Sequence, residues 1–155
     1  MARKGACPAP SMATPEQIDA LDERARAQAA EDARYGVLYD GLLSIGGVGV
    51  VPSEEPDLDK LLERGYLRDA RGVRMKKGRP VQCHGNAARI WEMNRNWAVI
   101  VTGWALTADG LWRQHSWVKD RRDDRLFETT TKRELYFGFD LEPAEAVIFY
   151  LNNRH

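Results

Sequence analysis

Apolar residues recur at helical spacing in two stretches of the first half of the chain, one after Thr14 and one over 56–64. Thr14 followed by Pro15 has the form of a helix N-terminus, and the apolar positions after it carry a helix to about residue 33. The apolar stripe of this helix is thin and rich in alanine, so we expect it to be peripheral or docked on a partner. A short second helix is predicted over 56–64, with leucines inward and Gly65 as its end.

Five glycines interrupt the apolar segment from Tyr35 to Val51, and this density opposes a helix. Val48 to Val51 is predicted as a strand instead. The segment lacks the Gly-Lys-Ser/Thr ending of a phosphate-binding loop, so nucleotide binding is not favoured there.

From Cys83 onward the spacing becomes helical again. Ala87, Ile90 and Trp91 fall on the same face as Cys83, at offsets of four, seven and eight positions. We therefore expect Cys83 to open a helix and to share its core-facing side.

The second half of the chain has the alternation of an antiparallel meander. Three strand-like runs are rich in β-branched and aromatic residues, over 97–106, 111–119 and 125–130. Asp109-Gly110 is a strong hairpin signal between the first two. Residues 141–152 favour a short helix, with a strand as the alternative, and the segments 65–80 and 131–142 are expected to be loops. This order predicts an α+β fold in which the Cys83 helix packs on an antiparallel sheet, with the N-terminal helix at the periphery.

Length and charge limit the function. The chain of 155 residues fits one domain, expected over 15–155, with a catalytic-type core over about 75–155 and a disordered leader over 1–14. Lys and Arg together number 23, as do Asp and Glu, which argues against nucleic-acid binding through bulk positive charge. The stretch from Arg71 to Arg79 holds five basic residues and is predicted to be a solvated loop, with an anion-binding role as the alternative.

Two further features suggest the cellular setting. Neither a signal-peptide pattern nor a membrane-length apolar run is present, so a cytoplasmic location is expected. The two cysteines, Cys7 and Cys83, do not form the spacing pattern of a disulfide framework, and Cys83 is expected to be a free thiol.

Cys83 and His115 are the candidates for chemistry. A cysteine becomes nucleophilic as the thiolate, which a helix N-terminus and a nearby imidazole both favour. Strand alternation places Arg113, His115 and Trp117 on one face, where they are expected to point at a helix packed across the sheet. Glu128 lies in the middle of the next strand and is the best candidate to orient His115. The acids at the turn over 120–124 are weaker candidates.

This arrangement resembles the papain-like superfamily, and within it the transglutaminase-like branch with its small bacterial and phage members. The motifs that carry the resemblance span about residues 80–131, and they are Cys83-His84-Gly85-Asn86-Ala87, His115-Ser116-Trp117 and Glu128-Thr129-Thr130. The sequence departs from the pattern at Glu128, where such proteins usually have aspartate.

The resemblance implies a cysteine hydrolase or acyltransferase that acts on a protein, peptide or small amide. Cys83 would be the nucleophile, His115 the general base and acid, and Glu128 the orienting carboxylate. The backbone N–H of Cys83 and the side chain of Gln82 are the candidate oxyanion donors.

Three other residues are candidates for the cleft, each with an alternative. Asn86 is either a surface amide at the site or a tie between the helix and a loop. Arg113 is either a substrate anchor or an ion-pair partner of Glu128. Trp117, together with Trp112, either walls a substrate cleft or belongs to the core.

Two other functions compete. Cys83, His84, His115 and His155 include possible metal ligands, but adjacent Cys-His is poor spacing for one tetrahedral centre, and no metal or other cofactor is predicted. The second alternative is a catalytically inactive fold that binds a protein, as an immunity, inhibitor or phage accessory module.

His84 is expected to point about 100° away from Cys83 and to lie at the rim of the site or on the surface.

Overall fold

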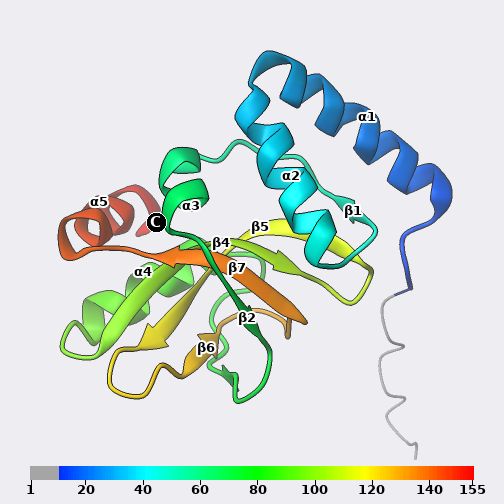
Figure 1. Ribbon diagram of the computed structural model, residues 1–155. Helices are drawn as coiled ribbons and strands as arrows, with labels where there is room; N and C mark the ends of the chain where they lie inside the picture. Colours follow the sequence, from blue (N-terminus) through cyan, green and yellow to red (C-terminus); the bar gives the residue numbers. More distant parts are fainter. Residues whose placement is uncertain (1–10) are drawn as a thin grey trace, which may run out of the picture.

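The computed structural model describes residues 11–155, so Cys7 and most of the expected leader lie outside the described residues. The chain is a mixed α+β protein with a curled seven-stranded sheet (Figure 1). Its elements follow in the order α1 Pro15–Glu31, α2 Ala33–Ile45, β1 Gly49–Val50, α3 Leu58–Arg64, β2 Tyr66–Asp69, β3 Arg74–Met75, α4 Cys83–Met93, β4 Ala98–Leu106, β5 Leu111–Asp120, β6 Leu126–Glu128, β7 Leu135–Asp140 and α5 Pro143–Asn153.

The hairpin of β4 and β5 is the centre of the sheet. Nine residue pairs join the two strands, from Ala98 opposite Asp120 to Leu106 opposite Trp112. Gly110 takes a φ of 84° at the turn, a left-handed conformation that glycine adopts without steric cost. The hairpin predicted from Asp109-Gly110 is confirmed, and the sheet extends from it in the order β2-β7-β4-β5-β6-β3.

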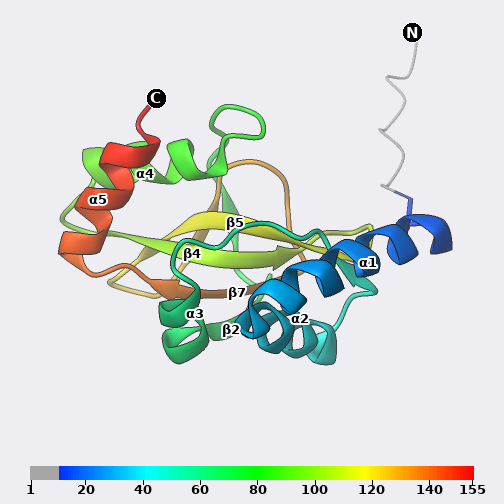
Figure 2. The same cartoon turned by 90° about the horizontal axis from the view of Figure 1, so that it is seen from above.

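Strand alternation sorts the buried side chains onto two faces. One face carries Ile100, Trp104 and Val118, which pack against the apolar sides of α2, α3, α4 and α5. The other face carries a smaller cluster that includes Val101, Trp117, Leu126 and Tyr136. Figure 2 shows α4 and α5 side by side, and the two helices contact each other. The larger core therefore lies between the sheet and the helices, and α4 is anchored there.

The outer edge of β5 is only partly paired. Parallel β1 covers Leu111 and Trp112, and antiparallel β6 covers Val118 and Lys119. Between these two pairings, residues 113–117 have no strand partner on that edge in the described part of the chain. This gap leaves the middle of β5 open at the side, where α4 begins.

Most expected elements are present. The helices expected at the N-terminus, over 56–64, from Cys83 and near the C-terminus are confirmed, and α1 buries no residue, as expected of a peripheral helix. Within residues 11–155, no helix is both long and apolar enough to cross a membrane.

The prediction was wrong over four segments. Helix α2 runs through Gly36 and Gly41, because Leu38, Tyr39 and Leu42 bury its inner side. The expected loops over 65–80 and 131–142 contain strands β2, β3 and β7, and the third strand of the meander ends at Glu128 instead of residue 130. Strand β7 pairs on both edges, with β4 and β2, so its conformation comes from tertiary pairing that local pattern does not encode.

Two glycine substitutions are predicted to act in opposite directions. A Cβ at Gly103 would overlap the carbonyl oxygen of Phe137 on β7, so Gly103→Ala should lower the free energy of unfolding by at least about 2 kcal/mol. A Cβ at Gly41 on α2 meets nothing within 4 Å, so Gly41→Ala should raise it by about 0.5–1 kcal/mol. Chemical denaturation measures both. Equal stabilities of the two variants would contradict the strand packing described here.

Candidate functional site

Cys83 is the first residue of α4, and the segment before it is held in place by Asn86. The Asn86 side chain accepts from the backbone N–H of Arg79 at 2.9 Å and donates to its carbonyl oxygen at 2.8 Å. A Cβ at Gly78 would overlap the Asn86 amide, so this close approach requires glycine. Asn86 is buried and ties the helix to the loop, the second of its two expected roles.

The residue pair before Cys83 has an unusual conformation. Val81 has a φ of 52°, which is rare for a β-branched residue, and its side chain is 96% exposed. Such local strain persists only where surrounding contacts impose it, and it is concentrated at functional sites. Gln82 caps α4 without a side-chain hydrogen bond, so the backbone N–H groups of the first turn stay available to a ligand.

His115 and Glu128 form a fully buried hydrogen bond. Nε2 of His115 lies 2.7 Å from Oε1 of Glu128. Continuing the register of β5 and β6 places Glu128 opposite Trp117, so His115 is its diagonal neighbour on the same face. The glutamate side chain is long enough to span this diagonal.

Glu128 is held by donors on both carboxylate oxygens. Oε2 accepts from the backbone N–H groups of Thr129 and Thr130, and the Tyr136 hydroxyl donates to Oε1 at 3.0 Å. Burial raises the pKa of Glu128, but His115 and the backbone of Thr130 outweigh it and hold the pKa below its ordinary value. The carboxylate is therefore a fixed negative charge beneath His115.

The Cys83 thiol lies between two imidazoles. Burial raises its pKa, but hydrogen bonds with His115 and His84 outweigh this effect and bring the pKa to about 5. Burial lowers the pKa of His115, while its contacts with Cys83 and Glu128 raise it above the ordinary value. Since Nε2 of His115 is engaged by Glu128, Nδ1 is the nitrogen left for the thiol. The three side chains favour a thiolate–imidazolium pair next to a carboxylate.

The way Cys83 and His115 meet differs from the expectation. The apolar side of α4 packs on the face of the sheet that carries Ile100 and Val118, whereas His115 and Trp117 point to the opposite face. The helix therefore does not lie across the His115 face. Cys83 and His115 instead line one cleft at the open edge of β5.

This edge position explains the role of His84, which the sequence analysis placed at the rim or surface. His84 is half-buried, and its Nδ1 lies 2.6 Å from the Ser116 hydroxyl, which in turn lies 2.9 Å from the Thr102 hydroxyl. Because Ser116 follows His115 on β5, its side chain emerges on the other face. His84 and His115 thus come from opposite faces of the sheet, and both lower the pKa of Cys83.

The remaining expected site residues divide between core, cleft and surface. Trp117 is buried, and its ring stacks under His115 with centroids 5.9 Å apart, while Trp112 is buried and donates to the carbonyl oxygen of Gly46. Arg113 forms an ion pair with Asp109 at 2.8 Å and does not pair with Glu128. Gln82 is exposed and is not among the residues that line the cleft at Cys83.

The cleft at Cys83, called the thiol cleft below, has a volume of about 460 Å³. The loop before α4, the middle of β5 and the segment after β6 form its walls, and its lining residues are Lys77, Gly78, Pro80, Val81, Cys83, Arg113, Gln114, His115, Thr129, Thr130, Thr131 and Arg133. Gln114 was not singled out from the sequence. Its position beside His115 was the available signal, since it lies at the open edge of β5.

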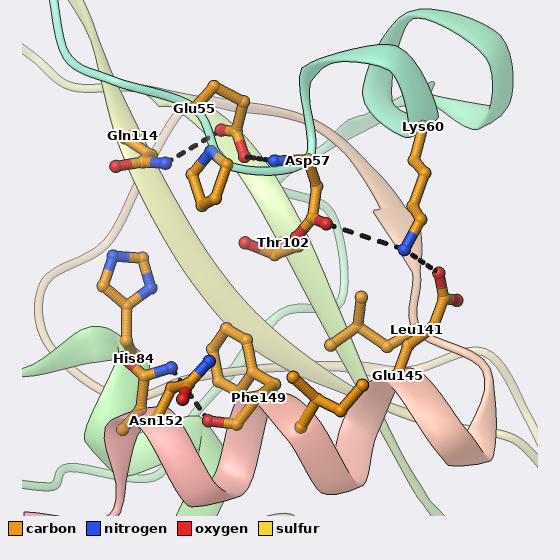
Figure 3. A pocket seen from close by; sticks show the side chains of 13 residues that line it. Glu55, Asp57, Lys60, His84, Thr102, Gln114, Leu141, Glu145, Phe149 and Asn152 are labelled. Carbon is orange, nitrogen blue, oxygen red and sulfur yellow. Dashed lines mark hydrogen bonds and ion pairs between the residues drawn. The ribbon is translucent and has the colours of Figure 1, made fainter.

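A second cavity of about 450 Å³ lies beyond His84 (Figure 3). It contains the carboxylates of Glu55, Asp57 and Glu145, and Lys60 lies 2.8 Å from the last of these. Burial raises the pKa of Glu55, which accepts from Gln114 Nε2 at 2.9 Å. Gln114 lines both cavities, so it forms part of the wall between them.

Within residues 11–155, no three His, Cys, Asp or Glu side chains gather as a metal site would require. No protein-family model, curated protein or solved structure matches the chain. The site geometry therefore carries the functional argument.

Replacing the carboxylate beneath His115 should weaken the thiolate. In Glu128→Gln, the imidazolium loses its buried counter-charge, so the pKa of Cys83 should rise by about one unit or more. The pH dependence of Cys83 alkylation measures this shift, in a Cys7→Ser background with folding checked by circular dichroism. Glu63→Gln makes the same charge change on the exposed side of α3 and should leave the pKa of Cys83 unchanged. An equal pKa in folded Glu128→Gln would show that the carboxylate does not support the ion pair.

Proposed function

We propose that the protein is a cysteine-dependent hydrolase or acyltransferase that acts on an amide or related acyl bond. The observation that carries this proposal is that Cys83 and His115 line the same cleft, and that His115 is hydrogen-bonded to buried Glu128. The three groups have the roles that the papain-like and transglutaminase-like resemblance assigns to them. Their order along the chain and their helix, strand and strand origins agree with that assignment.

The first half-reaction forms a thioester. The Cys83 thiolate attacks the carbonyl carbon of the substrate, forming the S–C bond, and the carbonyl electrons move to oxygen. When the tetrahedral intermediate collapses, the C–N bond breaks and the imidazolium of His115 gives its proton to the leaving amine. Neutral His115 then remains, with Glu128 holding its Nε2–H.

The second half-reaction returns the enzyme to its starting state. Nδ1 of His115 takes a proton from an incoming water or amine, whose oxygen or nitrogen attacks the thioester carbon. Collapse breaks the S–C bond and releases an acid or a new amide, with Cys83 again as thiolate beside imidazolium. The same residues serve both outcomes, since only the incoming nucleophile differs.

The oxyanion requires donors that face the thiol cleft. The backbone N–H of Cys83 is one, because it lies in the uncapped first turn of α4. Gln114 replaces Gln82 as the second candidate: one N–H of its amide goes to Glu55, and the amide has another to give. The hydrogen bond to Glu55 fixes the amide before substrate arrives.

The proposal predicts an alkylation profile for Cys83 that is unlike that of a free thiol. In a Cys7→Ser background, the iodoacetamide rate constant should rise with pH through about 5 and stay level through neutral pH, because the thiolate is already formed there. In His115→Ala, the midpoint should move upward toward the ~8.5 of a free cysteine.

A midpoint near ~8.5 in the native protein, or labelling only after unfolding, would contradict the proposal. That result would favour the alternative of an inactive fold that binds a protein partner. Once a substrate is known, Cys83→Ala should abolish turnover while the variant remains folded.

A further inference from the structure

The lining of the thiol cleft has a charge that the proposed chemistry does not use. Lys77, Arg113 and Arg133 line it, and no Asp or Glu is among its lining residues. Arg113 is compensated by Asp109, and Arg133 lies 3.7 Å from Glu128. Lys77 has no carboxylate partner among the described residues, so the cleft has an excess of positive charge.

Two buried polar atoms at this cleft lack hydrogen-bond partners. Thr129 is fully buried, and its Oγ1 has no partner within residues 11–155. Nε of Arg133 is also buried without a partner, because Glu128 is too far away to accept from it. Buried donors in folded proteins are normally satisfied, so a hydroxyl and a guanidinium N–H left open at a cleft indicate a missing acceptor.

The basic stretch from Arg71 to Arg79 supplies the wall next to Thr129. Lys77 and Gly78 line the cleft, whereas Lys76 turns away and lies 5.8 Å from the ring of Trp97. The position of the stretch is fixed by Asn86 at Arg79 and by the backbone N–H of Gly78, which donates to the Thr129 carbonyl at 2.9 Å. The exposed ammonium group of Lys77 therefore belongs to the same cleft as the unpartnered donors of Thr129 and Arg133.

We propose that the thiol cleft binds an anionic carboxylate or phosphate group of the acyl substrate through Thr129 Oγ1, Arg133 Nε and Lys77. The acceptor oxygens of such a group would complete the two open hydrogen bonds, and charge-assisted bonds to guanidinium are strong and directional. This inference rests on the proposed function, since it names the substrate class for the nucleophile Cys83. It also assigns a role to the basic stretch as a wall of the binding cleft.

Two alkylating agents of similar size test the inference. Iodoacetate is anionic and iodoacetamide is neutral, and both react with Cys83 by the same displacement of iodide. The measured quantity is the ratio of their rate constants at pH 7 in the Cys7→Ser background. Because imidazolium alone also attracts an anion, the comparison is made between variants. Lys77→Glu should lower the ratio by roughly tenfold, while the neighbouring Lys76→Glu makes the same charge change outside the cleft and should change it much less.

Protection experiments identify the anion. Acetate or inorganic phosphate, at an ionic strength matched with sodium chloride, should slow the reaction of Cys83 with iodoacetamide. Slowing by acetate assigns a carboxylate, and slowing by phosphate assigns a phosphate. Thr129→Val removes the open hydroxyl without breaking a hydrogen bond within the described chain, and it should weaken this protection.

The two hypotheses fail differently. If Lys77→Glu and Lys76→Glu give the same ratio, or if neither anion protects, the cleft does not select an anionic substrate. If iodoacetamide itself reacts with the native protein no faster than with glutathione at pH 7, the proposed function fails instead.

Discussion

The site depends on a single buried carboxylate. Glu128 is fully buried, and desolvation alone would drive it to the neutral form. Five donors, from His115, Tyr136, Thr129 and Thr130, keep it charged. The Glu128 carboxylate stabilises the protonated form of His115, which is almost completely buried. The protonated ring in turn stabilises the Cys83 thiolate. The charges on Glu128, His115 and Cys83 alternate in sign, and each is stable in its buried position only because an opposite charge lies next to it.

The geometry also depends on an interruption in the sheet. His115 and Ser116 point to opposite faces of β5. If β5 were paired along its whole outer edge, the neighbouring strand would separate these faces, and no residue could lie near both side chains. Because β1 covers only its beginning and β6 only its end, the start of α4 fits against the middle of the strand. Cys83 can then contact groups from both faces, although α4 packs on only one of them.

The sequence predicted the parts of this arrangement that are local. The hairpin at Asp109-Gly110, the helix start at Cys83 and the alternation that places His115 and Trp117 on one face all follow from short-range pattern. The influence of His84 on Cys83 was missed. Helical periodicity gives the direction of a side chain around the helix axis, but it does not give the position of the helix start relative to the edge of the sheet. Strand β7 was missed because its pairing partners β2 and β4 lie far away in sequence. Helix α2 was missed because its buried Leu38, Tyr39 and Leu42 outweigh two glycines that oppose a helix locally.

The stacking of His115 on Trp117 links the reactive residues to a strand that contributes none of them. Trp117 packs directly over Gly138 of β7, and any side chain at that position would displace the indole and the imidazole above it. The position of the His115 imidazole relative to the Cys83 thiol thus depends on the lack of a side chain at Gly138. A substitution at Gly138 can consequently move His115 while every residue that lines the thiol cleft stays the same.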